Sequence, residues 1–324
     1  ALAQNPTFFT LSEIGGNDVL GYALSGGSGV DQTGNFDAAT YGINDITDPN
    51  VFAQVFSGMV TALTANGAKG VVANLPYITD LANFTTVPYN PVPLDAATAT
   101  AVNAGYAPYN GGLQAAAAAL AGTGLLTDEE VAKRTINFAA GQNAVVIIDE
   151  DLTDLGAINP AFAALPKYRQ ATADDLLILA SSAFIGTTVG GNAQLINGVT
   201  VPLADNWVLT PQEQANIKTA TDAYNATIAA IASSNSSIAM VDFKGVLSEA
   251  SSGIAFDGYT LTTSLVMGGL VSLDGVHLTA RGYALMANKI LAAMDAKFGS
   301  NFTTATNGLA KAGDYPTNYS PALR

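Results

Sequence analysis

The chain has 324 residues, of which 49% are hydrophobic and 12% are charged, and its formal net charge is −14. A mean hydropathy of +0.28 excludes a wholly disordered protein. No apolar run reaches the length of about 18 residues that a membrane-spanning helix needs. With 12 Lys and Arg against 26 Asp and Glu, and no basic cluster, the chain is not expected to bind nucleic acid or an anionic membrane surface.

Cysteine is absent and histidine occurs once, which excludes disulfides, thiolate chemistry and His-rich metal sites. The small share of charged residues, with abundant Ala, Thr, Asn and Gly, is typical of an exported bacterial protein. We therefore expect a secreted, periplasmic or outer-surface location. The first residues, Ala1 to Gln4, include neither an initiator Met nor a positive region, so we expect that a signal peptide was removed or never included.

Strands and helices alternate near the N-terminus. Thr7 to Ile14 is predicted to be a strand, and Lys69 to Leu75 is predicted to be the next one. Between them, Asp48 and Pro49 form an N-cap and a first helical position, and the helix is expected to reach about Asn66. The short connections indicate a right-handed crossover and a parallel sheet.

Residues 82–112 are rich in Pro, Asn, Tyr and Gly and are predicted to be a long functional loop. The remaining expected elements are a helix from the Thr127 capping box to about Gly141, a buried strand at Ala144–Ile148, a helix at Asp174–Ser181, a hairpin turn at Asn197-Gly198, a helix from the Thr210 capping box to about Ala232, a strand at Ile238–Val241, and a helix from Thr279 to about Phe298.

The single histidine, His277, follows Asp274 by three positions and directly precedes the last expected helix. A lone histidine is often a structural residue whose ring nitrogen binds a carbonyl. This spacing also allows a loop in which the Asp274 carboxylate reaches one ring nitrogen. The other nitrogen would then be available as a general base.

A second cluster, Gly15-Gly16-Asn17-Asp18, lies at the end of the first expected strand, where open α/β sheets build their sites. Such a segment can also be a simple glycine-rich turn. As a functional element, Gly15 and Gly16 would leave room for a substrate carbonyl and the Asn17 amide would donate to an oxyanion. Asp18 is expected to hold the turn together.

These two blocks resemble the GxND and DxxH blocks of the SGNH (GDSL-type) hydrolases. The sequences around these blocks, FFTL…IGGNDVLGYALSGG and SLDGVHLTARGYALMANKI, are similar to those of large exported members of the family from Bacteroidetes. The resemblance implies a three-layer α/β/α, flavodoxin-like SGNH hydrolase fold with a parallel central sheet. It implies one domain over residues 1–324, with long insertions around 82–112 and 150–210. It also implies roles for Asn17 as oxyanion donor, His277 as base and Asp274 as the residue that orients it.

The implied activity is that of an esterase- or lipase-like serine ester hydrolase that works through an acyl-enzyme, without a metal or an organic cofactor. The expected substrate is a small-molecule, lipid or glycan ester. Two alternatives remain open. One is a carbohydrate O-deacetylase, and the other is a non-catalytic surface- or carbohydrate-binding protein on the same scaffold.

The chain departs from the family at the nucleophile, because it contains no Gly-Asp-Ser. The serine is therefore expected in a missing N-terminal segment, whose separate fragment is a candidate partner, and an apolar strand edge is expected beside Thr7 to Ile14. Ser12, Ser25 and Ser28 are weaker candidates, since none is expected on a strand-to-helix turn. Within the expected strand, Glu13 should be neutral, paired or displaced by a bulge.

Overall fold

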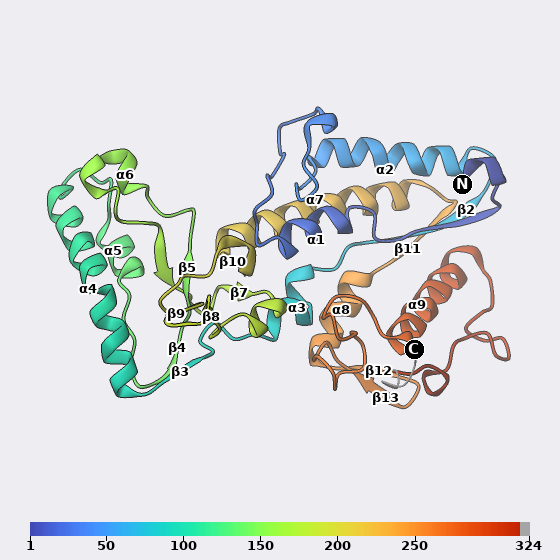
Figure 1. Cartoon of the computed structure of the whole chain (residues 1–324). Coiled ribbons are helices and arrows are strands. Elements are labelled where there is room, and N and C mark those ends of the chain that lie inside the picture. Colours follow the sequence, from blue (N-terminus) through green and yellow to red (C-terminus); the bar gives the residue numbers. More distant parts are fainter. Residues whose placement is uncertain (318–324) are drawn as a thin grey trace. The chain divides into compact units, whose positions relative to one another are not determined.

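The computed structural model describes residues 1–317 and has a mixed α/β architecture with a small parallel sheet and several helices (Figure 1). The chain divides into two compact units. Unit 1 comprises Ala1–Ala23, Gly29–Thr86 and the chain from Ala215 onward, and unit 2 comprises Leu24–Ser28 and Val87–Gln214. Among the described helices, none combines the length and the apolar character that crossing a membrane requires.

The sheet of unit 1 contains three parallel strands in the order β1 (Phe8–Leu11), β2 (Lys69–Ala73) and β11 (Ile238–Val241). The expected parallel sheet is therefore confirmed for these strands. Strand β1 is terminal, and in the described part of the chain it pairs with β2 alone. One edge of β1 is free, and its side chains Phe8, Phe9 and Leu11 are only partly buried.

Helices cover both faces of this sheet (Figure 1). On one side lie α1 (Gly16–Leu24), α2 (Pro49–Thr64) and α7 (Pro211–Ser234), where the ring of Phe52 stacks on that of Tyr224 with 4.2 Å between centroids. On the other side lie α8 (Phe243–Ser252) and α9 (Ala280–Phe298), and Ile290 and Phe298 pack against the buried β2 and β11 residues. The smaller elements of unit 1 are η1 (Leu2–Gln4), η2 (Ala38–Thr40), η3 (Ile78–Asp80), α3 (Ala82–Thr85), β12 (Ile254–Phe256), β13 (Tyr259–Leu261) and η7 (Ala312–Asp314).

Unit 2 combines helices with short antiparallel strand pairs, β3 with β4, β5 with β6, β7 with β10 and β8 with β9. Both expected insertions fall largely within it. Its elements are β3 (Val92–Leu94), α4 (Ala96–Ala119), α5 (Asp128–Arg134), β4 (Gly141–Asn143), β5 (Val146–Ile148), α6 (Leu155–Ile158), η4 (Pro160–Phe162), β6 (Tyr168–Gln170), β7 (Leu176–Leu177), η5 (Leu179–Ala183), β8 (Thr188–Val189), β9 (Asn192–Ile196), η6 (Asp205–Trp207) and β10 (Val208–Leu209).

Side-chain caps begin several helices where the sequence predicts them. The Asp48 carboxylate accepts hydrogen bonds from the N–H groups of Asn50 at 2.8 Å and Val51 at 3.1 Å, and α2 starts at Pro49. Thr279 Oγ1 accepts from Gly282 N at 3.0 Å at the start of α9. These contacts satisfy donors that the first helical turn leaves free.

The expectation of a long loop over 82–112 was wrong, because α4 occupies Ala96–Ala119 and contains Pro108. Its side chains hold a neighbouring segment. The amide of Asn103 exchanges two hydrogen bonds with the backbone of Phe138, and the amide of Asn110 exchanges two with that of Ile136. These tertiary contacts stabilise a helix whose local composition resembles a loop.

Three further boundaries differ from the prediction. Strand β1 ends at Leu11, because Glu13 adopts a left-handed conformation with φ +64° and cannot continue an extended strand. Helix α5 ends at Arg134 rather than Gly141. The helix expected at Asp174–Ser181 is instead the short strand β7 followed by η5, because Leu177 pairs with Val208 of β10.

Candidate active site

The loop before α9 folds around the carboxylate of Asp274. Oδ1 accepts hydrogen bonds from the Ser272 hydroxyl at 2.6 Å, from Val276 N at 2.9 Å and from His277 N at 3.0 Å. Oδ2 lies 2.7 Å from Nδ1 of His277. The expected contact between Asp274 and His277 is therefore present, and the loop's own backbone fixes the direction of the carboxylate.

Asn83 of α3 anchors this loop from behind. Its side-chain amide donates to the carbonyl of Asp274 at 2.8 Å, and its backbone N–H donates to the carbonyl of Gly275 at 2.9 Å. Gly275 has φ +73°, and a Cβ there would lie 2.5 Å from Asn83 N, so a side chain would break the contact. Sequence reasoning missed Asn83, since a single Asn far from the DxxH block carries no signal of this contact.

The electrostatics of the loop keep Asp274 ionised. Burial acts to raise the pKa of Asp274, but the hydrogen bonds from Ser272, from the backbone and from His277 outweigh burial and hold this pKa well below its usual range. The imidazole of His277 is 68% exposed, so the nitrogen that does not face Asp274 is accessible. An ionised carboxylate on Nδ1 leaves Nε2 as the proton-accepting atom.

The second cluster forms the turn between β1 and α1. Gly16 begins α1, and its N–H donates to the carbonyl of Glu13 at 2.9 Å. Gly15 has φ +86°, and a Cβ there would lie 2.7 Å from the Phe52 ring, so this glycine serves the backbone turn. Asn17 is exposed in the first turn of α1, where the helix presents free N–H groups.

Asp18 follows Asn17 in the same turn and is partly buried. Burial raises the pKa of Asp18, against the smaller opposing effect of a hydrogen bond with Thr47. This contact connects the first turn of α1 to the segment that precedes α2. The sequence predicts that Asp18 holds the turn itself together, whereas this contact reaches a residue outside the turn.

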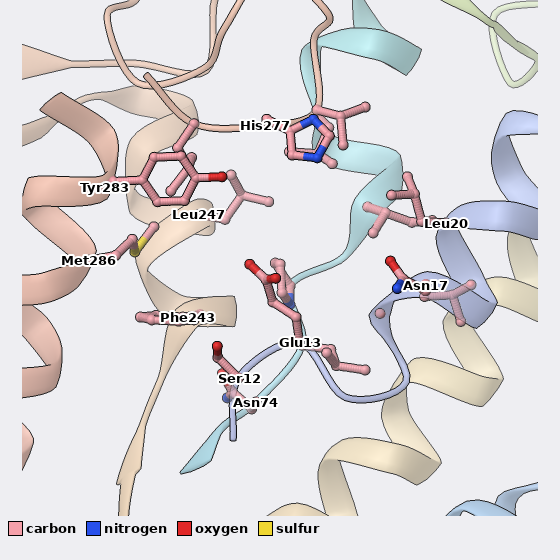
Figure 2. Close-up of a pocket in the computed structure, with 18 of the residues that line it drawn as sticks. Ser12, Glu13, Asn17, Leu20, Asn74, Phe243, Leu247, His277, Tyr283 and Met286 are labelled. Carbon is pink, nitrogen blue, oxygen red and sulfur yellow. The ribbon is translucent and has the colours of Figure 1, made fainter. Parts of the chain in front are cut away.

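A cavity of about 330 Å³ in unit 1 joins the two blocks (Figure 2). Gly16, Asn17 and His277 line it, whereas Gly15 and Asp274 are not among its lining residues. Figure 2 shows the Asn17 amide and the His277 ring on the same cavity. The apolar part of the lining is formed by Val19, Leu20, Leu75, Pro76, Ile78, Leu81, Phe243, Leu247, Val276, Leu278, Met286, Ala287 and Ile290.

Ser12 and Glu13 line the same cavity, and both are exposed. Ser12 does stand on a strand-to-helix turn, contrary to expectation, because β1 ends at Leu11 and α1 begins at Gly16. Figure 2 nevertheless places Ser12 and His277 at opposite ends of the cavity, with the Glu13 carboxylate between them. Ser12 is the one serine among the described residues that line this cavity.

Residues suited to a metal ion lie elsewhere in the described chain. One carboxylate, that of Glu13, lines the cavity of unit 1. The three carboxylates close enough to share an ion, Glu150, Asp205 and Glu213, all belong to unit 2. The polar side chains that meet at the unit 1 cavity include the His277 imidazole, which Asp274 orients, the Asn17 amide and the Glu13 carboxylate.

Comparison of the chain with protein-family models, with curated proteins and with solved structures gave no significant match. The functional interpretation therefore depends on the residues of the cavity and on their geometry.

Proposed function

We propose that the unit 1 cavity hydrolyses carboxylic esters through an acyl-enzyme, as an esterase- or lipase-like enzyme on an SGNH hydrolase scaffold. One observation carries the proposal. His277, oriented by an ionised Asp274, opens onto the same cavity as the Asn17 amide. Acyl transfer needs a base and an oxyanion donor on one small volume.

In this proposal Nε2 of His277 removes the proton of a serine hydroxyl as the serine attacks the ester carbonyl. The same nitrogen then returns the proton to the leaving alcohol. Asp274 holds the ring in the required tautomer and stabilises the imidazolium. The Asn17 amide donates to the tetrahedral oxyanion, and one such donor contributes about 3 kcal/mol to transition-state stabilisation.

The lining of the cavity favours an ester with an apolar acyl group. Leu20, Leu247, Met286 and Phe243 supply hydrocarbon and aromatic surface to the cavity that Asn17 and His277 also line (Figure 2). A pocket of about 330 Å³ is at the small end of ligand sites. A short acyl chain on a small-molecule or lipid ester suits these dimensions.

The serine is proposed to come from a strand that docks on the free edge of β1. The turn that carries Asn17 begins where β1 ends. The carboxyl end of a parallel neighbour at that edge would lie beside this turn. Such a strand would also shield the partly buried Phe8, Phe9 and Leu11 and enlarge the three-stranded sheet toward the SGNH fold.

Two alternatives each rest on one observation. Ser12 and Asn74 at one end of the cavity, and the Glu13 carboxylate beyond them, are polar and suit the hydroxyls of a glycan, which favours a carbohydrate O-deacetylase with the same chemistry (Figure 2). The separation of Ser12 from His277 favours a non-catalytic binding protein on the same scaffold.

The test is hydrolysis of short-chain aryl esters and of an acetylated polysaccharide by the protein purified from its natural source and by recombinant full-length protein. We expect turnover of the aryl ester that His277→Ala abolishes and that Lys297→Ala, a change at an exposed position near the end of α9, leaves intact. Preference for the acetylated polysaccharide identifies the deacetylase. Absence of turnover on both substrates contradicts the hydrolase.

A further inference from the structure

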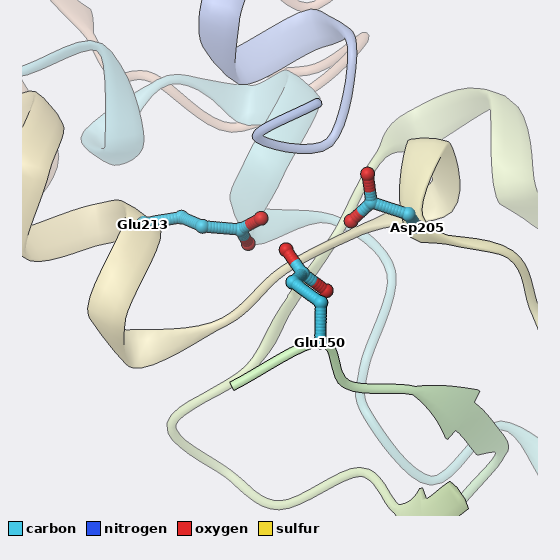
Figure 3. Close-up of side chains that lie close together, drawn as sticks. All are labelled: Glu150, Asp205 and Glu213. Carbon is cyan, nitrogen blue, oxygen red and sulfur yellow. The ribbon is translucent and has the colours of Figure 1, made fainter. Parts of the chain in front are cut away.

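Three carboxylates converge within unit 2. Glu150 follows β5, Asp205 begins η6, and Glu213 lies in the first turn of α7. One carboxylate oxygen of each lies within 4.8 Å of the others. Figure 3 shows the three side chains directed toward a common point from three separate segments of the chain.

Glu213 is buried, and its role in the capping box at the start of α7 uses only one of its two carboxylate oxygens. It is 3% exposed, and its Oε2 accepts from Thr210 N at 2.6 Å in the expected capping box. Among the described residues, no N–H or O–H donor reaches its buried Oε1 or Oδ1 of Asp205, and the carboxyl of Glu150 adjoins both residues. A buried carboxylate oxygen without a partner costs free energy. Capping thus uses one oxygen of Glu213, and the other has no donor among the described residues.

The loop that contains Gly26 and Gly27 packs directly against the cluster of Glu150, Asp205 and Glu213. A Cβ on Gly27 would lie 1.9 Å from Oε1 of Glu213, and a Cβ on Gly26 would lie 2.1 Å from the carbonyl oxygen of Asp205. Both glycines have positive φ, at +66° for Gly26 and +77° for Gly27. The backbone therefore approaches the cluster more closely than any residue with a side chain would allow.

Among the described residues, no cationic side chain pairs with a carboxylate of the cluster, and Lys167 Nζ donates to the backbone carbonyl of Glu150 at 2.7 Å rather than to its side chain. None of the ion pairs formed by the described residues includes Glu150, Asp205 or Glu213.

Other buried carboxylates of unit 2 form ion pairs with cationic side chains. Buried Arg169 forms an ion pair with Asp149 and donates to both oxygens of Asp175. Arg169, together with Lys133, which pairs with Asp149 at 3.2 Å, thus supplies a positive charge for each of the two buried carboxylates there. Among the described residues, no Lys or Arg side chain pairs in this way with Glu150, Asp205 or Glu213.

We propose that Glu150, Asp205 and Glu213 bind one Ca²⁺ ion in unit 2. Carboxylate oxygens are the ligands of hard divalent cations, and oxygens on one Ca²⁺ lie at most about 5 Å apart, because each Ca–O distance is about 2.3–2.6 Å. The ion partners the two buried oxygens and joins the end of β5, η6 and the start of α7. Its role is structural, and it is separate from the chemistry of the unit 1 cavity.

The position of the single tryptophan gives a direct test. Trp207 is the only tryptophan of the chain and lies two residues after Asp205 in η6. We expect Tb³⁺, a luminescent probe for Ca²⁺ sites, to emit when Trp207 is excited, and added Ca²⁺ to displace it. Isothermal titration with Ca²⁺ should give one site, and Ca²⁺ should raise the melting temperature relative to EDTA.

The variants separate ligation from general charge effects. Glu150 is exposed, so Glu150→Gln should fold and should weaken Ca²⁺ binding by at least about tenfold. Glu129→Gln removes the same charge from an exposed position of α5 and should bind as wild type. The proposal is wrong if wild-type protein gives no heat of Ca²⁺ binding in the titration and no Tb³⁺ emission sensitised by Trp207. Equal binding by the Glu150→Gln and wild-type proteins overturns it as well.

Discussion

Oδ2 of Asp274 lies 2.7 Å from Nδ1 of His277, while Oδ1 of the same carboxylate accepts the backbone N–H groups of Val276 and His277. One short loop thus sets both the direction of the carboxylate and the orientation of the ring. The opposite ring nitrogen is accessible, and His277 lines the cavity that Asn17 also lines. The effects expected of changes at Asp274 and Asn83 follow from this arrangement.

Asp274→Asn should reduce kcat for a short-chain aryl ester by roughly two to four orders of magnitude. The amide cannot hold the Nδ1-protonated tautomer of His277 or stabilise the imidazolium. The measurement is steady-state kinetics of the full-length protein. Asp314→Asn, the same change at an exposed position of unit 1, should leave kcat unchanged. An unaltered kcat in Asp274→Asn would show that His277 does not work through this carboxylate.

Asn83→Ala should lower kcat with little effect on KM, because Asn83 touches the loop and not the substrate. Loss of its hydrogen bond to Asp274 should also reduce the free energy of unfolding by about 1–2 kcal/mol. Asn288→Ala removes an amide that bonds to Ala310 elsewhere in unit 1 and serves as the matched control. If kcat fell equally in the two variants, Asn83 would contribute only to the stability of the fold and would not position the Asp274 loop for catalysis.

The predictable parts of the fold are those with a local cause. Asp48 with Pro49, and Thr279 before α9, begin helices through contacts within a few residues, and the sequence contains those contacts. The pairing of Asp274 with His277 is equally local, because three positions separate them. Such features follow from spacing alone.

The parts that could not be predicted depend on distant partners. Helix α4 is held by Asn103 and Asn110, whose amides bind a segment 26 to 35 residues further along the chain. Asn83 reaches a carbonyl 191 residues away. In these cases composition and periodicity favour another local structure or give no indication of the contact. The observed structure depends instead on the long-range contact.

Asp222→Asn should reduce the loss of stability in acid. Lys218, then Tyr77 and Lys244, lower the pKa of Asp222 to about 2, below the value of about 3.9 in an unfolded chain. The carboxylate therefore stabilises the fold above pH 4 or so, and this contribution disappears as the pH falls toward about 2. Chemical denaturation at several pH values between about 4 and 2 should give a shallower slope for the variant. A slope equal to that of wild type would contradict the assigned partners.

Thr10→Pro should abolish ester hydrolysis while leaving unit 1 folded. Thr7 O accepts from Lys69 N on the β2 side, so by strand alternation the N–H of Thr10 faces the free edge of β1. Proline there removes a donor that a docked strand would use, and an edge position tolerates it. Thr10→Val keeps the N–H and should remain active. Full activity in Thr10→Pro, with unchanged circular dichroism, would rule out strand docking at this edge.

Covalent labelling tests the central claim most directly. The protein purified from its natural source is treated with a fluorophosphonate that reacts with activated serines, and the labelled peptide is identified by mass spectrometry, with His277→Ala recombinant protein as the control. The account predicts one labelled serine, on a strand that docks beside β1 and outside the 324-residue sequence, and no label in His277→Ala. Label on Ser12 would contradict the proposed source of the nucleophile, and a protein that takes up no label would contradict the hydrolase itself.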